Sequence, residues 1–378
     1  MVGVVEKGHR IPSLDGLRAI SIALVLLGHL AGTRGFPVSA AAGNWLGLGE
    51  FGVHVFFVIS GFLITRLLLD ELKQTGRISL GSFYFRRTLR IFPAYYGFLL
   101  VVFVASAAGS IQLAKGDLFH ALTYTSNYDP GRSWFVGHTW SLSVEEQFYL
   151  LWPALIVLAG PRRALIAAAV AVLAAPLVRT GSWELMRWSG EGIGHRFETV
   201  ADAVAIGCLL AGTRGWLHRS ARYMKGMASP WFVLVPVLAV AGNMLHDHPV
   251  AHFLIGMSAM NVAVALALDW CLTFHSGRVG RVLNAAPLVY VGTLSYSLYL
   301  WQQLFLNRSA VNAASAFPVN LLLVCAAALA SFYLIERPSL QLRRRVETAW
   351  RRQRPAPAGA PLLRRQLDHE NVLTEGAL

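Results

Sequence analysis

The sequence predicts an all-α, polytopic integral membrane protein, and three observations support that fold class. Of its 378 residues, 55% are hydrophobic and only 14% are charged, whereas a soluble protein of this length carries roughly 25% charged residues. The apolar residues gather in blocks of about 16 to 23, the length a helix needs to cross a hydrocarbon core of about 30 Å. The basic residues, which give a formal net charge of +13, crowd into alternate connections between these blocks.

About ten of the apolar blocks are long enough to form transmembrane helices. Placing the N-terminus in the cytosol puts 26 of the 33 Lys and Arg residues on the inner side and seven on the outer side. Cytosolic connections of membrane proteins carry this excess of positive charge. We therefore expect both termini in the cytosol and no nucleic-acid partner. The predicted spans are residues 14–32, 51–69, 91–108, 140–159, 164–178, 198–212, 231–245, 250–272, 286–306 and 317–336.

The chain divides into one membrane domain and one tail. The membrane domain covers residues 1–338, and the tail covers residues 339–378. The tail is rich in arginine and too polar to build a core. We expect it to be flexible and to lie against anionic membrane lipids on the cytosolic side. The longer outer connections are predicted at residues 33–50, 109–139 and 179–197.

Arg18 and His29 are ionisable residues in the first predicted span. Eleven residues separate them, which corresponds to about 16 Å along a helix and to about three turns, so both lie on one face. A buried histidine is often only a structural residue. Because ionisable groups inside a membrane are costly, the pair instead favours function, with His29 as a general base.

Arg87 and Arg90 precede the third predicted span on its cytosolic side. Because they are three residues apart on a helix, their guanidinium groups can converge. Each guanidinium group presents several N–H donors in a plane, an arrangement that suits phosphate oxygens. The alternative interpretation is that they only anchor the span by the positive-inside rule.

Glu145 and Glu146 lie near the outer end of the fourth predicted span. Glu146 could form a capping box with Ser143, but two adjacent acids in a membrane exceed what a cap needs. We expect them at about the depth of His29, where one orients the imidazole and the other contacts an acceptor hydroxyl.

The same reasoning selects the other candidate site residues. Trp140, Ser141 and Tyr149 of the fourth span and Asp202 of the sixth are candidate substrate-binding residues, and Asp202 could alternatively pair with an arginine. The histidines between spans seven and eight lack nearby cysteines or a carboxylate triad, so we expect no metal site.

An ordered set of motifs across residues 11–338 resembles the acyltransferase-3 family of bacterial membrane O-acyltransferases. The motifs are Leu14-Asp15-Gly16-Leu17-Arg18 with His29, Phe56-Phe57-Val58-Ile59-Ser60-Gly61-Phe62-Leu63, Arg87-x-x-Arg90, Trp140-Ser141-Leu142 with Glu145-Glu146-Gln147-Phe148-Tyr149, Ser295-Tyr296 with Tyr299-Leu300-Trp301, and Ile335-Glu336-Arg337-Pro338. The sequence departs from the family pattern at His54, where an acidic residue is frequent, and at Gln302, where a histidine often stands.

The resemblance implies a multi-pass enzyme of the bacterial inner membrane that uses acyl-CoA as cosubstrate, with acetyl-CoA the first candidate. The acceptor would be a hydroxyl of a glycan, a lipooligosaccharide or a secondary metabolite. Arg18 and His29 match the family's essential pair, and Arg87 and Arg90 match the arginines thought to hold coenzyme A phosphates. A membrane transporter that uses the same polar residues is the alternative, but the sequence shows no clear internal repeat.

Overall fold

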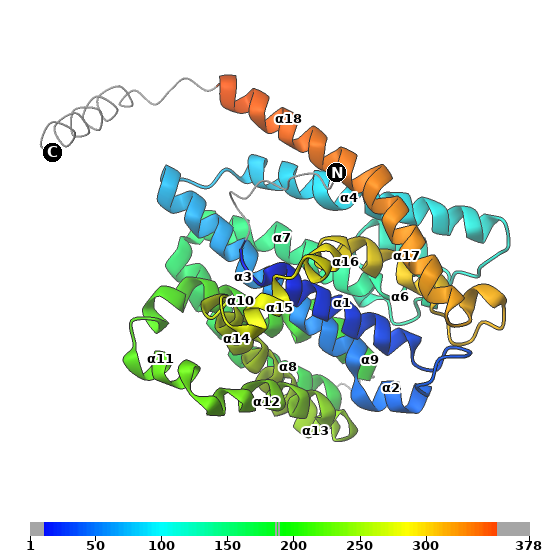
Figure 1. Ribbon diagram of the computed structural model, residues 1–378, viewed down its shortest axis with the longest axis horizontal. Coiled ribbons are helices and arrows are strands. Elements are labelled where there is room, and N and C mark those ends of the chain that lie inside the picture. The colour runs from blue at the N-terminus through cyan, green and yellow to red at the C-terminus, as the bar shows by residue number, and fades with distance from the viewer. Residues whose placement is uncertain (1–10, 186, 188–189, 354–378) are drawn as a thin grey trace, which may run out of the picture.

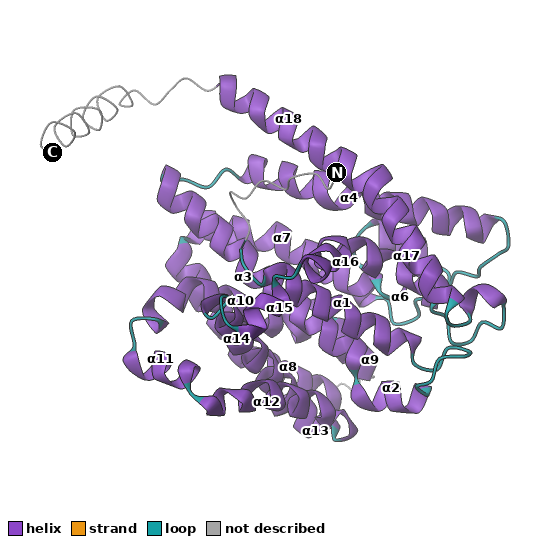
Figure 2. Cartoon of the chain, in the orientation of Figure 1, coloured by secondary structure: helices purple, strands orange, loops and turns teal. Residues whose placement is uncertain are grey.

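The computed structural model describes residues 11–185, 187 and 190–353, which fold into helices joined by mostly short connections (Figure 1). No strand occurs among these residues (Figure 2), and the predicted all-α class is therefore confirmed. The α-helices are α1 (Leu14–Leu30), α2 (Ala40–Leu46), α3 (Leu48–Thr75), α4 (Leu80–Ala107), α5 (Asp117–Leu122), α6 (Trp134–Gly137), α7 (Thr139–Ala159), α8 (Pro161–Glu184), α9 (Gly190–His195), α10 (Phe197–Leu217), α11 (Ala221–Ala228), α12 (Leu234–Asn243), α13 (Pro249–Ala251), α14 (Met257–Thr273), α15 (Arg278–Leu283), α16 (Ala286–Phe305), α17 (Val319–Ser331) and α18 (Arg337–Gln353).

Eight helical stretches in the described part of the chain are long and apolar enough to cross a membrane. Each coincides with one of the predicted spans, and some of them join two neighbouring helices. The number of ten spans and the cytosolic placement of both termini stay predictions. The eight stretches are Ala40–Thr75, Leu80–Ala107, Trp134–Ala159, Pro161–Glu184, Phe197–Leu217, Pro230–Asp247, Pro249–Thr273 and Val319–Trp350.

The first and ninth predicted spans fold as α1 and α16, two helices in the middle of the bundle (Figure 1). They pack against each other, and α1 also packs against α3. Because protein surrounds it, α16 can bury polar side chains, as where Ser297 donates a hydrogen bond to Glu336. Polar residues inside a membrane protein face the protein interior for this reason.

Glycines let α3 and α10 approach each other closely. A Cβ atom added at Gly61 would lie 2.0 Å from the carbonyl oxygen of Val204, and one at Gly207 would lie 2.2 Å from that of Val58. Small residues at a crossing allow this close backbone packing between membrane helices. The crossing holds α3, which lines the candidate site, against α10.

The crossing predicts opposite effects for two alanine substitutions on α10. Gly207→Ala is expected to destabilise the protein by about 1–3 kcal/mol, because the added methyl group overpacks the crossing. Gly215→Ala is the control, since a Cβ there meets nothing within 4 Å, and alanine improves helix propensity by about 1 kcal/mol. Thermal unfolding of the detergent-solubilised variants measures both effects, and equal stabilities would contradict the close crossing.

The predicted outer connections contain more helix than expected. Short helices α2, α5 and α6 interrupt two of them, and α8 continues to Glu184 instead of ending before residue 179. The charged Arg179 can lie within this helix because its guanidinium group is ion-paired with Asp202 inside the protein, at 2.9 Å. The third outer connection therefore begins after residue 184.

The start of the basic tail also differs from the expectation of a flexible segment from residue 339. α17 continues through a π-helical turn (Phe332–Glu336) into α18, in which Pro338 is the second residue. Pro338 has no backbone N–H to give to the helix, and the π-helical turn just before it changes the hydrogen-bond pattern there, so the helix can continue past the proline. The ring centroids of Phe85 and Trp350 lie 4.8 Å apart where α18 packs on α4. The predicted flexibility beyond residue 353 falls outside the described residues.

Candidate active site

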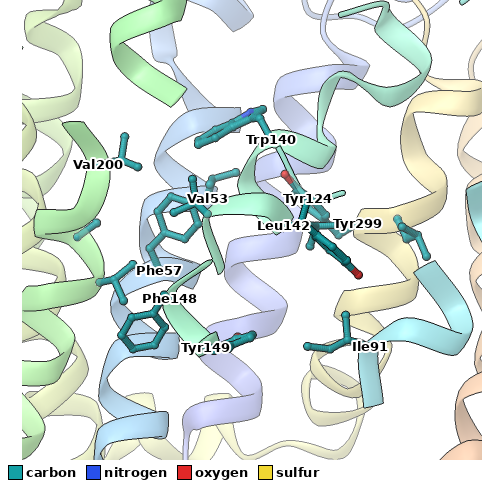
Figure 3. Close-up of a cluster of buried hydrophobic side chains, with 14 of the residues drawn as sticks. Val53, Phe57, Ile91, Tyr124, Trp140, Leu142, Phe148, Tyr149, Val200 and Tyr299 are labelled. Atoms are coloured by element: carbon teal, nitrogen blue, oxygen red, sulfur yellow. The ribbon is translucent and has the colours of Figure 1, made fainter. Parts of the chain in front are cut away.

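The described residues enclose a pocket between α1, α3, α4, α7 and α16. Its empty volume is about 880 Å³, a figure that includes the solvent-filled space at its open mouth. Several lining side chains belong to the buried cluster in Figure 3. The lining residues are Arg18, Val53, Phe56, Phe57, Ile59, Ser60, Leu63, Ile64, Arg87, Arg90, Ile91, Ser141, Leu142, Glu145, Glu146, Tyr149, Ser295, Tyr296 and Tyr299.

Three arginines stand in the wall of this pocket. Arg18 comes from α1, and Arg87 and Arg90 come from α4. The Arg87 guanidinium carbon lies 5.0 Å from the centre of the Tyr149 ring, a cation–π contact that leaves its N–H groups free. Within the part of the chain that the structure describes, none of the three makes a hydrogen bond or an ion pair. Such guanidinium groups are ready to bind an anion.

The neighbouring Arg86 shows how differently an arginine of the same helix can be placed. One of its guanidinium nitrogens lies 3.4 Å from a carboxylate oxygen of Glu71, and its side chain does not line the pocket. The sequence groups Arg86 with Arg87 and Arg90 as cytosolic charge. The structure separates a paired arginine from two that face the pocket.

Glu145 and Glu146 line the pocket together with the arginines rather than beside His29. Glu145 lies within electrostatic range of Arg18 and Arg87, and Glu146 within range of Arg87. One carboxylate oxygen of Glu146 is buried without a hydrogen-bond partner among the described residues. The expectation that one of these acids contacts the imidazole is not what the structure shows.

Hydroxyl groups lead from the arginines along the pocket. The hydroxyls of Ser60 and Tyr149 lie 2.6 Å apart, and those of Ser141 and Tyr299 lie 2.5 Å apart. Tyr299 also donates to the backbone oxygen of His138, at 3.1 Å. Two of the predicted substrate-binding residues, Ser141 and Tyr149, therefore face this pocket.

His29 lies just beyond the end of the pocket opposite the arginines. The pocket follows α3 from Val53 to Ile64, which is about 16 Å of helix. A Cβ atom on Gly49 would lie 4.0 Å from Nε2 of His29, and Gly49 is one turn, about 6 Å, beyond Val53. The structure thus places Arg18 in the pocket wall and His29 beyond the opposite end of the pocket.

The imidazole of His29 is held by two neighbours. Its Nδ1 lies 2.8 Å from the side-chain oxygen of Gln302 on α16, and its ring meets that of Trp134 edge-on, with centroids 5.5 Å apart. The sequence interpretation left the role of Gln302 in doubt. A signal was present, because Ser295, Tyr299 and Gln302 follow at helical spacing on one face of α16.

Trp140 stands outside the pocket wall, with its ring centroid 4.2 Å from that of His195. Burial, and next the nearby Arg132 guanidinium, lower the pKa of His195 well below its ordinary value. The ring is therefore neutral at pH 7 and can accept a hydrogen bond from Arg132, at 2.5 Å. Trp140 packs over this pair.

Asp202 also lies outside the pocket wall, in a buried ion pair with Arg179. Its two carboxylate oxygens accept from the two terminal guanidinium nitrogens at 2.9 and 3.1 Å, and Ser258 donates to it at 2.8 Å. Neither charged side chain is exposed. Of the two sequence interpretations, substrate binding and pairing with an arginine, the geometry matches the second.

This ion pair predicts that two substitutions together are milder than one. Asp202→Ala alone is expected to cost about 3–5 kcal/mol, because it leaves the Arg179 guanidinium buried and unpaired. The double variant Arg179→Met/Asp202→Ala removes both charges and should recover most of the folded yield, measured as monodisperse protein in detergent. If the double variant folds but cannot bind substrate, the result would instead support the interpretation of Asp202 as a substrate-binding residue.

One comparison with known proteins establishes the family of the chain. The family model described as an acyltransferase domain matches residues 11–337. The chain belongs to the acyltransferase-3 family. The match includes every residue that lines the pocket, and with the eight membrane-capable stretches of the described chain it identifies a multi-pass membrane protein. The family membership predicted from the motifs is confirmed.

Relatives of this acyltransferase-3 protein include one from Bacillus subtilis and one from Staphylococcus aureus. A Bacillus subtilis (strain 168) protein provisionally named peptidoglycan O-acetyltransferase YrhL is 28% identical over 367 residues, covering 87% of this chain and 55% of that protein. O-acetyltransferase OatA of Staphylococcus aureus (strain NCTC 8325 / PS 47) is 27% identical over 364 residues, covering 87% of this chain and 57% of that protein. The chain thus spans about half the length of these curated relatives. No solved structure matches it.

Proposed function

We propose that this protein is a membrane O-acetyltransferase that moves an acetyl group from acetyl-CoA to a hydroxyl group of a cell-envelope glycan. The observation that carries the proposal is that Arg18, Arg87 and Arg90 line one pocket without a hydrogen-bond or ion-pair partner among the described residues. The phosphates of coenzyme A would satisfy their donors. The names of the relatives favour acetyl as the acyl group, and the name of the Bacillus subtilis relative makes peptidoglycan the first candidate acceptor.

In the proposed mechanism the donor lies along the pocket, with its phosphates at the arginines and its thioester toward His29. Nε2 of His29 takes the proton of the acceptor hydroxyl as the hydroxyl oxygen attacks the thioester carbonyl. The carbon–sulfur bond then breaks, and the imidazolium returns the proton to the thiolate of coenzyme A. Fixing both reactants in a site that excludes water supplies much of the rate.

The two acids of the pocket receive a different proposed role from the one expected from sequence. Because Glu145 and Glu146 lie within range of Arg87, we assign them to the arginine end of the pocket, where the donor phosphates would bind. Orienting the imidazole falls to another residue.

The membrane orientation predicted from the basic residues belongs to the same proposal. The arginine end of the pocket would then face the cytosol, where acetyl-CoA is made, and His29 would lie toward the outer face. Reporter fusions at positions 43 and 125 are expected to indicate the outside, and a fusion at position 80 the inside. An inside signal at position 125 would contradict this orientation.

Donor use and acceptor use can be tested separately on the purified full chain. Radiolabelled acetyl-CoA should bind the detergent-solubilised protein and lose its acetyl group to soluble peptidoglycan fragments with release of free thiol. Base-labile acetyl groups on the fragments identify an ester at oxygen. Binding of acetyl-CoA without transfer would reject peptidoglycan as the acceptor, and failure to bind acetyl-CoA would reject the donor.

A further inference from the structure

Gln302 is a fully buried residue of α16 whose amide is only half satisfied. Its side-chain oxygen lies 2.8 Å from Nδ1 of His29, and its side chain has no exposed surface. Its amide nitrogen is buried with no hydrogen-bond partner among the described residues. A buried amide N–H without a partner costs about 1–3 kcal/mol. Such a group marks a place where a bound molecule can accept the bond.

The contact with Gln302 decides which nitrogen of His29 can act as a base. An amide oxygen only accepts, so Nδ1 must carry the proton and Nε2 must hold the lone pair. No residue of the described chain makes a hydrogen bond to Nε2, which lies over the backbone of Gly49. The edge of Trp134 further restricts rotation of the ring. The base is thus oriented before any substrate arrives.

The free amide N–H of Gln302 continues the polar face that α16 presents to the pocket. Ser295 and Tyr299 on the same helix line the pocket, and Gln302 follows Tyr299 by three residues, about 4.5 Å further along the helix. The thioester carbonyl of a donor that threads from Arg18 toward His29 would arrive at this end. A neutral N–H donor there is suited to an oxygen that gains negative charge.

We propose that Gln302 is the residue that orients His29 as a base and that its amide N–H stabilises the acyl oxygen during transfer. This rests on the proposed function. As Nε2 takes the hydroxyl proton and the new carbon–oxygen bond forms, the carbonyl π electrons move onto the acyl oxygen, where the amide N–H donates to it. The electrons return when the carbon–sulfur bond breaks, and the imidazolium proton passes to the departing thiolate.

The two roles of Gln302 can be separated with two substitutions. Gln302→Leu removes both hydrogen bonds, so kcat is expected to fall about 10- to 100-fold, as when a group that orients a histidine is lost. The KM for acetyl-CoA should stay unchanged, because the phosphates bind at the far end of the pocket. Gln302→Glu keeps an acceptor for Nδ1 but lacks the N–H donor. Its kcat should lie between those of the wild type and the Leu variant, and the acidic limb of its pH–rate profile should move to higher pH by about one unit or more, because the carboxylate favours the imidazolium.

Asn320→Leu on α17 is the matched control, since Asn320 is a fully buried amide that donates to the backbone oxygen of Ser315, away from the pocket. It should lower folded yield at most, with kcat and the pH profile of the folded protein unchanged. The proposal is overturned if Gln302→Leu keeps wild-type kcat, if it loses no more than Asn320→Leu, or if an active Gln302→Glu shows an unshifted acidic limb. Should Gln302→Glu not fold, the split between kcat and KM in Gln302→Leu decides alone. A wild-type protein that transfers no acetyl group would instead reject the proposed function itself.

Discussion

Replacing both Arg87 and Arg90 by alanine is expected to weaken acetyl-CoA binding at least about 100-fold. The estimate follows because a hydrogen bond to a charged group contributes about 1.5–3 kcal/mol, and the double variant loses at least two. Both guanidinium groups face the pocket without a hydrogen-bond or ion-pair partner among the described residues, so no buried carboxylate loses its partner in the variant and the fold should stay intact. Binding of radiolabelled acetyl-CoA to the purified variant measures the effect.

Arg86→Ala is the matched control for this experiment. Arg86 sits on the same helix and carries the same charge, but it faces Glu71 and not the pocket. It should bind the donor like the wild type, and Lys at 87 and 90 should recover only part of the affinity, because an ammonium group lacks the two-pronged geometry of a guanidinium. If the double Ala variant and Arg86→Ala bind equally well, the pocket arginines only anchor the helix.

Removing the imidazole of His29 is expected to abolish transfer while donor binding survives. Loss of a general base costs about 10²–10⁴-fold in rate, and His29 lies beyond the end of the pocket opposite the arginines. His29→Ala and His29→Asn should therefore bind acetyl-CoA like the wild type and release almost no thiol when peptidoglycan fragments are added. Binding and thiol release are measured on the same preparation.

His120→Asn provides the comparison for His29→Asn. The Nδ1 atom of His120 is hydrogen-bonded to Thr125 at 2.8 Å, and the residue lies outside the pocket, so its replacement should leave transfer unchanged. Robust transfer by His29→Asn would mean that the imidazole only supplies a hydrogen bond. The base would then have to be sought at Glu145 or Glu146, despite their position beside the arginines.

Much of the candidate site could be predicted because membrane helices follow simple periodic rules. Apolar blocks long enough to cross a bilayer locate the helices, and the cost of ionisable groups in lipid singles out residues such as Arg18, His29 and Arg87. Helical spacing alone puts Arg18 and His29 on one face about 16 Å apart. The structure places Arg18 in the pocket wall and His29 beyond the opposite end of the pocket, in agreement with this spacing.

Contacts between helices could not be predicted in the same way. The position of Glu145 near the outer end of its predicted span suggests the same membrane depth as His29. In the structure its side chain instead lines the pocket with the arginines. The sequence cannot distinguish Asp202 as an ion-pair partner from Asp202 as a ligand, because Arg179 comes from a different helix. The extension of helix beyond Pro338 likewise depends on packing of α18 against α4.

The sequence by itself determined the all-helical membrane class, the family and the residues that carry charge within the helices. The class follows from composition and the length of the apolar blocks, the family from its resemblance in an ordered set of motifs, and the charged residues from their positions within apolar blocks. Only the tertiary structure decided which charges are paired, with Arg86 facing Glu71 and Arg87 facing the pocket. It alone brought Gln302 to His29, 273 residues away along the chain. Which charged side chains pair depends on which faces of two helices meet. Close packing at glycines and buried side chains set how each helix is rotated against its neighbour.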